Sequence, residues 1–216
     1  MRYRALTVSR QYGSGGGRIA NAIAHWLGWK LLDSEIIAAI ARAARVEPKV
    51  VRHFDERGES WLRRLNAEAV RGVAMAFGGP VGEGELFDAH AMAGLTRRII
   101  EEAYEAGNCV VVGRGAQCIL EHKRDVYRVF VYAPLRERIC RLRARLGPGT
   151  DIAERIRDVD GRRAKYLLQN FNRSWCDLSL YDLMIRSEED DEATARIILQ
   201  AMGVEAPVPA SGVCRQ

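Results

Sequence analysis

Short apolar runs alternate along the chain with longer stretches in which apolar residues recur at helical spacing. The apolar runs have the length and β-branched content of strands, and they lie at 5–8, 30–32, 110–112, 129–132 and 183–185. Helical spacing follows at 19–26, and acidic residues at 188–191 suit the start of another helix. Continuous apolar strands that alternate with helices are typical of parallel sheets covered on both faces. The pattern therefore predicts an α/β fold with a five-stranded parallel sheet.

The segment between the second and third predicted strands departs from this alternation. Apolar residues recur there at helical spacing, at positions 61, 65, 69 and 73, and four of the seven residues 78–84 are glycine. This predicts an amphipathic helix that runs into a flexible loop. Two interpretations of the region near 47–90 remain open: a decorated surface hairpin, or a subdomain that covers a substrate.

The length and composition suit one domain of ordinary size. The chain has 216 residues, of which 48% are hydrophobic and 28% charged, so it can bury a sizeable core. Periodicity is lost past Gly203, where Pro207 and Pro209 occur. We therefore expect a single domain over 1–203 and a frayed tail over 204–216.

Charge and cysteine content exclude several classes of protein. Lysine and arginine number 33 against 28 acidic residues, a net charge of +5 that suits an anionic ligand. No basic surface interleaved with aromatic residues accompanies it, so we expect no nucleic-acid partner. The chain lacks a long apolar run and an N-terminal h-region, so we expect neither a membrane span nor secretion. The five scattered cysteines lack a C-x-x-C pair, which predicts free thiols in a cytoplasmic protein and no metal site.

A glycine cluster lies between the first predicted strand and the helix that follows it. The sequence LTVSRQYGSGGGRIA places there Gly13, Ser14, Gly15, Gly16 and Gly17. Glycines in this position allow backbone N–H groups to surround an anion at the positive end of a helix. The context of strand, glycines and helix therefore predicts a phosphate-binding loop.

The chain resembles the cytidylate kinase-like family, a divergent branch of the P-loop nucleoside monophosphate kinases. The motifs that carry this resemblance are SRQYGSGG, LLDSE, VVVGRGA, VFVYAP and YDL, in this order. The resemblance implies the three-layer fold of P-loop NTPases, with a helical insert near 47–90 over the acceptor and an arginine-rich lid near 141–165 over ATP. It also implies transfer of the γ-phosphoryl group of ATP, bound with Mg²⁺, to CMP or dCMP. Two alternatives stay open: a nucleotide-binding regulator without turnover, and a kinase of a non-nucleotide small molecule.

The resemblance also assigns roles to residues outside the loop. WKLLDS places Asp33 and Ser34 at the acceptor site, and VGRG places Arg114 where it would hold the acceptor phosphate. Asp33 followed by serine is equally an ordinary helix cap. In IRDVDGRRAKY, Asp160 and Arg162 would face the transferred phosphoryl group, or Arg162 would form a surface pair with Asp158.

Positive charge is concentrated in residues 134–173, which hold 11 lysines and arginines and 5 acidic residues. Arg138, Arg141 and Arg145 share one helical face, and apolar residues share another. This stripe is either a solvated basic face or a lid over the phosphates of a nucleotide. A turn at Pro148 and Gly149 would join two lid helices.

The loop departs from the usual pattern G-x-x-x-x-G-K-[ST], because Arg10 stands at the first glycine and Gly16 at the lysine. If the chain turns over, an arginine must supply the missing charge. The sequence favours Arg18, on the first turn of the helix, while Arg10 would bind phosphate or pin the loop. The predicted catalytic residues are Arg18, Arg114, Arg141, Arg145, Asp160 and Arg162.

Overall fold

A computed structural model of the chain describes residues 2–33, 89–147, 151–187 and 190–206. The chain divides into two units, the first formed by Met1–Asp33 and Ile100–Gln216, the second by Ser34–Ile99. We describe the first unit by itself. Of the second unit, only residues 89–99 are described, and the predicted helix and glycine-rich loop of the insert lie outside the described residues. Most of the predicted tail, 207–216, lies outside them as well.

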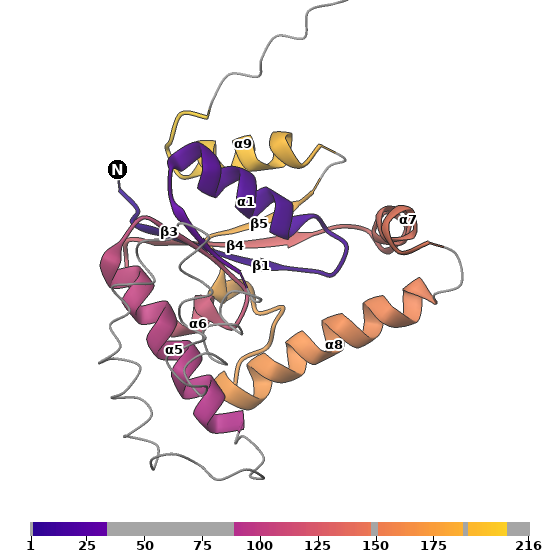
Figure 1. Ribbon diagram of the computed structural model, residues 1–216, viewed down its shortest axis with the longest axis horizontal. Coiled ribbons are helices and arrows are strands. Elements are labelled where there is room, and N and C mark those ends of the chain that lie inside the picture. The colour runs from indigo at the N-terminus through magenta and orange to yellow at the C-terminus, as the bar shows by residue number, and fades with distance from the viewer. Residues whose placement is uncertain (1, 34–88, 148–150, 188–189, 207–216) are drawn as a thin grey trace, which may run out of the picture. The chain divides into compact units, whose positions relative to one another are not determined.

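A five-stranded, fully parallel sheet forms the centre of the first unit and confirms the predicted fold class (Figure 1). Its strands, in chain order, are β1 (Ala5–Arg10), β2 (Lys30–Leu32), β3 (Cys109–Val112), β4 (Val126–Tyr132) and β5 (Leu183–Arg186). The spatial order is β2-β3-β1-β4-β5, so β1 lies in the middle of the sheet. Because all strands are parallel, the loops that follow β1 and β3 leave the sheet at the same edge.

Helices cover both faces of the sheet. On one face lie α1 (Gly16–Leu27) and α9 (Asp191–Ala201), and their apolar residues pack with Leu6, Val8 and Val129 (Figure 1). On the other face, Phe130 packs with residues of α8 (Ile152–Phe171) and of the 3₁₀ turn Leu178–Leu180. Successive residues of β4 thus point to opposite faces, as the period of a strand requires. The result is the expected three-layer arrangement.

The remaining helices are α5 (Ala89–Ala106), α6 (Ala116–Ile119) and α7 (Leu135–Leu146). The sequence analysis makes no prediction for the segment that forms α5. Helices α7 and α8 confirm the two predicted helices of the arginine-rich segment, whose intervening turn lies outside the described residues. Both begin as the sequence allows, α7 after Pro134 and α8 after Asp151, whose side chain accepts a hydrogen bond from the Glu154 N–H.

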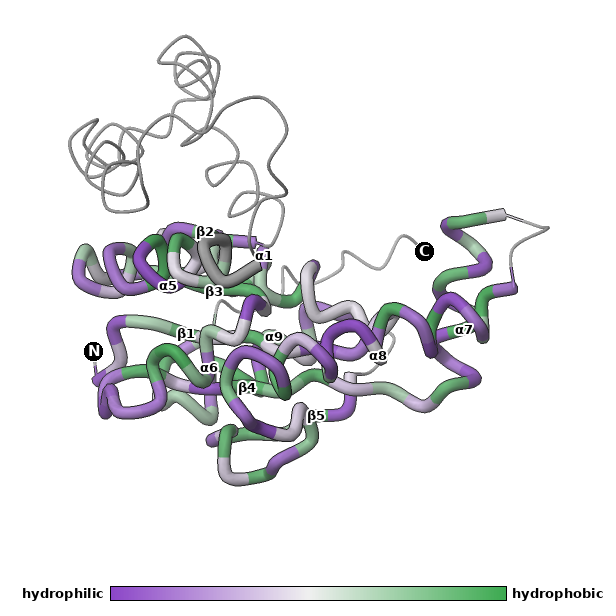
Figure 2. Tube along the Cα trace, turned by 90° about the horizontal axis from the view of Figure 1, so that it is seen from below, coloured by the Kyte–Doolittle hydropathy of each residue, from purple (hydrophilic) through white to green (hydrophobic). Residues whose placement is uncertain are grey.

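Hydrophobicity differs sharply between the sheet and these two helices (Figure 2). The residues of β3 are all buried, whereas α7 carries five arginines and a single fully buried apolar residue, Leu142. No helix within the described ranges is long and apolar enough to cross a membrane. Four of the five cysteines are described, and each of these carries a free thiol.

Candidate active site

The glycine loop joins the central strand β1 to α1 and leaves several backbone donors unused. The N–H groups of Gly13, Gly15, Gly16 and Gly17 donate to no acceptor among the described residues. The first hydrogen bonds of α1 begin only beyond them, because the N–H groups of Arg18 and Ile19 donate to the Gly15 carbonyl. These free donors lie at the positive end of the helix dipole. The free donors make the loop a candidate anion site, and phosphate binding there stays a prediction.

Two of the glycines are required by their surroundings. Gly15 has a φ of +81°, and a Cβ there would lie 2.3 Å from Oδ1 of Asp191. Gly16 occupies the position of the usual P-loop lysine, and a Cβ there would lie 2.5 Å from the Cβ of Arg10. Any side chain at either position would thus displace its neighbours.

Ser14 holds the loop in shape. It is buried, and its Oγ lies 2.9 Å from the Gln11 carbonyl and 3.2 Å from the Val131 carbonyl. The Ser14 N–H also donates to the Gln11 carbonyl. Both donors of Ser14, its hydroxyl and its backbone N–H, therefore stabilise the turn. The glycine amides remain as the candidate ligands of a phosphate.

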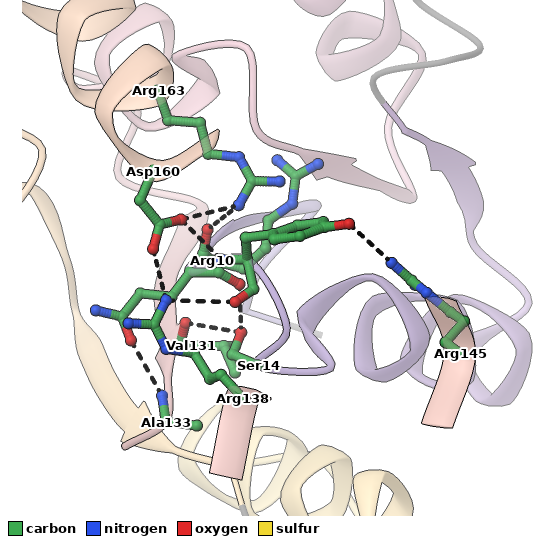
Figure 3. A network of polar contacts seen from close by, with 10 residues as sticks. Arg10, Ser14, Val131, Ala133, Arg138, Arg145, Asp160 and Arg163 are labelled. Carbon is green, nitrogen blue, oxygen red and sulfur yellow. Dashed lines mark hydrogen bonds and ion pairs between the residues drawn. The ribbon is translucent and has the colours of Figure 1, made fainter. Parts of the chain in front are cut away.

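The arginine stripe of α7 lies against the glycine loop (Figure 3). Arg138 donates from Nη1 to the Tyr12 carbonyl (3.3 Å), and Arg141 donates from Nη1 to the Ser14 carbonyl (3.3 Å). Arg145 donates from Nη2 to the Tyr12 hydroxyl (3.3 Å). Arg138 is 8% exposed, so a solvated basic face does not describe this end of the stripe, whereas Arg145 is exposed.

Helix α8 contributes a carboxylate to the same loop. Asp160 accepts the Tyr12 N–H at Oδ1 (2.8 Å) and the Arg138 Nη1 at Oδ2 (2.6 Å), as Figure 3 shows. Its side chain is 15% exposed, and that of Arg138 is 10% exposed. The pair is thus largely desolvated, and Asp160 has both oxygens committed to holding the loop.

Two adjacent arginines of α8 have different surroundings. Arg162, which the sequence placed near the phosphoryl group, is 68% exposed and pairs with Asp158 at 3.0 Å. Arg163 instead donates from Nη1 to the Arg10 carbonyl (2.8 Å) and lies 3.6 Å from Asp160 (Figure 3). The sequence reasoning missed Arg163. Its position three residues after Asp160 could have revealed it, because residues at that spacing share a helix face.

Arg10 and Arg114 come together where β1 and β3 end. The guanidinium of Arg10 lies against Gly113, since a Cβ at Gly113 would be 2.0 Å from the Arg10 Nη1. Burial and the positive charge of Arg163 lower the pKa of Arg10 to about 9, Asp33 opposes this shift, and Arg114 adds to it. Arg114, at a φ of +56°, and Asp33 thus belong to the same electrostatic environment. Ser34 lies outside the described residues.

Arg18 lies at the other end of the loop. Its Nε pairs with Oδ2 of Asp191, the first residue of α9, and its side chain is 63% exposed. The Asp191 side chain is 17% exposed. Arg18, which the sequence favoured as the substitute for the lysine, is thus paired with a carboxylate of the protein.

The chain belongs to the cytidylate kinase-like family, which it matches over residues 5–189. This match confirms the resemblance found in the sequence motifs. A comparison with curated proteins finds no match.

Two solved structures can be compared with this chain. An uncharacterized protein from Eubacterium ventriosum ATCC 27560 is 20% identical, with a TM-score of 0.65, and the match covers 94% of this chain and 99% of that chain. A shikimate kinase from Bacteroides thetaiotaomicron is 16% identical, with a TM-score of 0.49, and the match covers 93% and 98% of the two chains. The first of these establishes a shared fold over nearly the whole of both chains.

Proposed function

We propose that this protein is an ATP-dependent phosphotransferase that converts a nucleoside monophosphate to its diphosphate, with CMP or dCMP as the acceptor. The observation that carries the proposal is the convergence of unused glycine amides and several arginines on one loop, in a member of the cytidylate kinase-like family. Phosphoryl transfer depends on such donors and cations, because charge is spread over three equatorial oxygens in the transition state. The choice of cytidine nucleotides rests on the resemblance of the sequence motifs alone.

The donor phosphates would bind the amides of Gly13 and Gly15–Gly17. Arg141 donates to the Ser14 carbonyl and to Ser187, and Arg145 donates to the Tyr12 hydroxyl. Both would exchange these partners for bound phosphates. Arg18 would lie beside the phosphates at the start of α1. Asp160 would act as a positioning residue, because it holds Tyr12 and Arg138.

Mg²⁺ would arrive with the nucleotide. Within the described residues no group of three or more His, Cys, Asp or Glu side chains could hold a metal ion. Gly17 also stands where the usual loop has a serine or threonine hydroxyl for the ion. The nucleotide phosphates and water would therefore supply most of its ligands.

The acceptor phosphate would bind Arg114, with Asp33 beside it after β2, and a role for Ser34 stays a prediction from the sequence. An oxygen of this phosphate would attack the γ-phosphorus, and the bond between the γ-phosphorus and the β,γ-bridging oxygen would break to release ADP. A phosphate monoester is largely deprotonated at neutral pH, since its second pKa is about 6. The reaction thus needs no general base, which agrees with the engagement of both Asp160 oxygens.

The proposal is tested by ADP release from Mg²⁺-ATP in a coupled assay against nucleoside monophosphates and hydroxyl-bearing metabolites. We expect ADP release that requires CMP or dCMP, and a rise in KM for the acceptor in Arg114→Ala. Arg196→Ala is the matched control, because Arg196 pairs with Glu192 of α9 and lies over the Trp26 ring, and neither partner belongs to the proposed site. Turnover only with hydroxyl acceptors would establish a kinase of another class. ATP-dependent thermal stabilisation without turnover would establish a regulator.

A further inference from the structure

The loop shows a reciprocal exchange relative to the usual P-loop pattern. Arg10 stands where that pattern has its first glycine, and Gly16 stands where it has its lysine. The structure explains why the two changes occur together. A Cβ at position 16 would lie 2.5 Å from the Cβ and 3.0 Å from the Cγ of Arg10. A lysine at 16 and an arginine at 10 therefore exclude one another in this conformation.

The exchange places the cation on residue 10, at the end of β1, in place of residue 16, at the start of α1. The cation thus stays next to the glycine loop. The Arg10 guanidinium lies against Gly113, one residue before the proposed acceptor-binding Arg114. The Arg10 carbonyl is fixed by Nη1 of Arg163 at 2.8 Å, and Arg163 also lies 3.6 Å from Asp160 (Figure 3). Arg10 is thus held between the glycine loop and the end of β3, the region between the donor and the acceptor in the proposed reaction.

The charge of Arg10 lies in a crowded, partly buried region. Burial lowers the pKa of Arg10 to about 9, Arg163 and Arg114 add to this shift, and Asp33 opposes it. Arg10 therefore shares the end of β1 and β3 with two further arginines of the described chain.

We propose that Arg10 replaces the P-loop lysine and contacts the phosphoryl group while it passes from donor to acceptor. This inference rests on the proposed phosphotransferase function. Arg10 would stabilise the charge on the equatorial oxygens as the bond to the acceptor oxygen forms and the bond to ADP breaks. Arg18 is less suited to this role, because Asp191 already balances its charge and its side chain is largely exposed.

The test exchanges the two positions. Arg10→Met removes the charge and keeps an apolar stem, and we expect kcat to fall by about 10³-fold, on the scale of known arginine fingers. Gly16→Lys alone should be equally impaired, because its Cβ meets Arg10. The double variant Arg10→Gly with Gly16→Lys restores the usual pattern and should recover at least a tenth of wild-type kcat. Arg196→Ala is the matched control, because the partners of Arg196, Glu192 and the Trp26 ring, lie outside the proposed site.

Two further measurements separate a catalytic from a structural role. Guanidinium chloride at low millimolar concentration should partly restore kcat of Arg10→Ala, which loss of a merely structural contact would not allow. Thermal stabilisation by inorganic phosphate should be present in the wild type and lost in Arg10→Met, and this readout holds even if the wild type phosphorylates no acceptor. Normal kcat in Arg10→Met, or undiminished phosphate binding, would overturn the inference. Failure of the wild type to turn over, with phosphate binding that depends on Arg10, would overturn only the proposed function.

Discussion

The two ends of the glycine loop carry one arginine each, and the two arginines have opposite surroundings. At the downstream end, Arg18 is largely exposed and pairs with Asp191 of α9. At the upstream end, Arg10 is partly buried, lies against Gly113 and has Arg163 and Arg114 as charged neighbours. The first arginine is paired with a carboxylate of α9, and the second has two further arginines, together with Asp33, among its charged neighbours.

This difference separates two candidate positions for a cation that contacts phosphate. A cation that the fold pairs with a carboxylate gains little from a phosphate, because the two anions compete for it. A cation held among other cations gains much more, because the phosphate removes an existing repulsion. The upstream end is therefore the better candidate for the place where charge develops during transfer.

The largest expected effect comes from Arg163, which fixes the upstream end. Arg163→Ala removes the hydrogen bond to the Arg10 carbonyl and one of the positive charges beside it. We expect kcat to fall by about 10³-fold. Arg162→Ala, its neighbour on the solvent side, should change kcat by no more than about threefold, because its partner is the exposed Asp158. Steady-state kinetics of the two variants would show which arginine serves the loop, and equal losses would contradict this assignment.

The next effect concerns the stability of the loop. Asp160→Ala leaves Arg138 without its carboxylate partner in a largely buried position and frees the Tyr12 N–H. Breaking a buried pair in this way typically lowers the free energy of unfolding by about 3 kcal/mol. Asp158→Ala, on the exposed side of the same helix, should lower it by less than about 0.5 kcal/mol. Urea denaturation followed by circular dichroism measures both, and similar values for the two variants would argue against the role given to Asp160.

A smaller loss is expected at the downstream end from Gly15→Ala. The positive φ and the contact with Asp191 Oδ1 should together lower the free energy of unfolding by about 2 kcal/mol. Gly17→Ala is the control, since a Cβ there meets nothing within 4 Å and its backbone N–H is retained. Its stability should equal or slightly exceed that of the wild type. Thermal unfolding of the two variants measures this difference. A melting temperature of Gly15→Ala equal to that of the wild type would contradict the prediction.

The smallest effect is expected from Arg18 itself. Arg18→Ala removes an exposed ion pair, so stability should change little. We expect KM for ATP to rise about threefold with kcat nearly retained, as for a ground-state contact. Arg10→Met measured beside it gives the direct comparison of the two ends. A collapse of kcat in Arg18→Ala would restore the hypothesis that the sequence favoured.

Much of the fold follows from local patterns in the sequence. The apolar runs at 110–112 and 129–132 fall within β3 and β4, because a parallel strand inside the sheet must be apolar on both faces. The glycine cluster fixed the position of the loop, and the spacing of Arg138, Arg141 and Arg145 correctly placed them on one face of α7. Helix α5 escaped prediction, since its apolar periodicity follows a glycine-rich segment without a clear start signal.

The sequence by itself determined the order of the five strands, the position of the glycine loop and the absence of the usual lysine, because these depend on neighbouring residues. Only the tertiary structure decided which arginines serve that loop. Arg162 and Arg163 are adjacent in sequence, yet about 100° of helical rotation turns one to solvent and the other to the loop. Arg10 and Arg18 likewise look equivalent in the sequence, since each flanks the glycine loop. In the structure, Arg18 lies beside the Asp191 carboxylate of α9, whereas Arg10 has Arg114 and Arg163 among its neighbours. Charge acts through space, so its balance at a site is set by segments that the fold brings together.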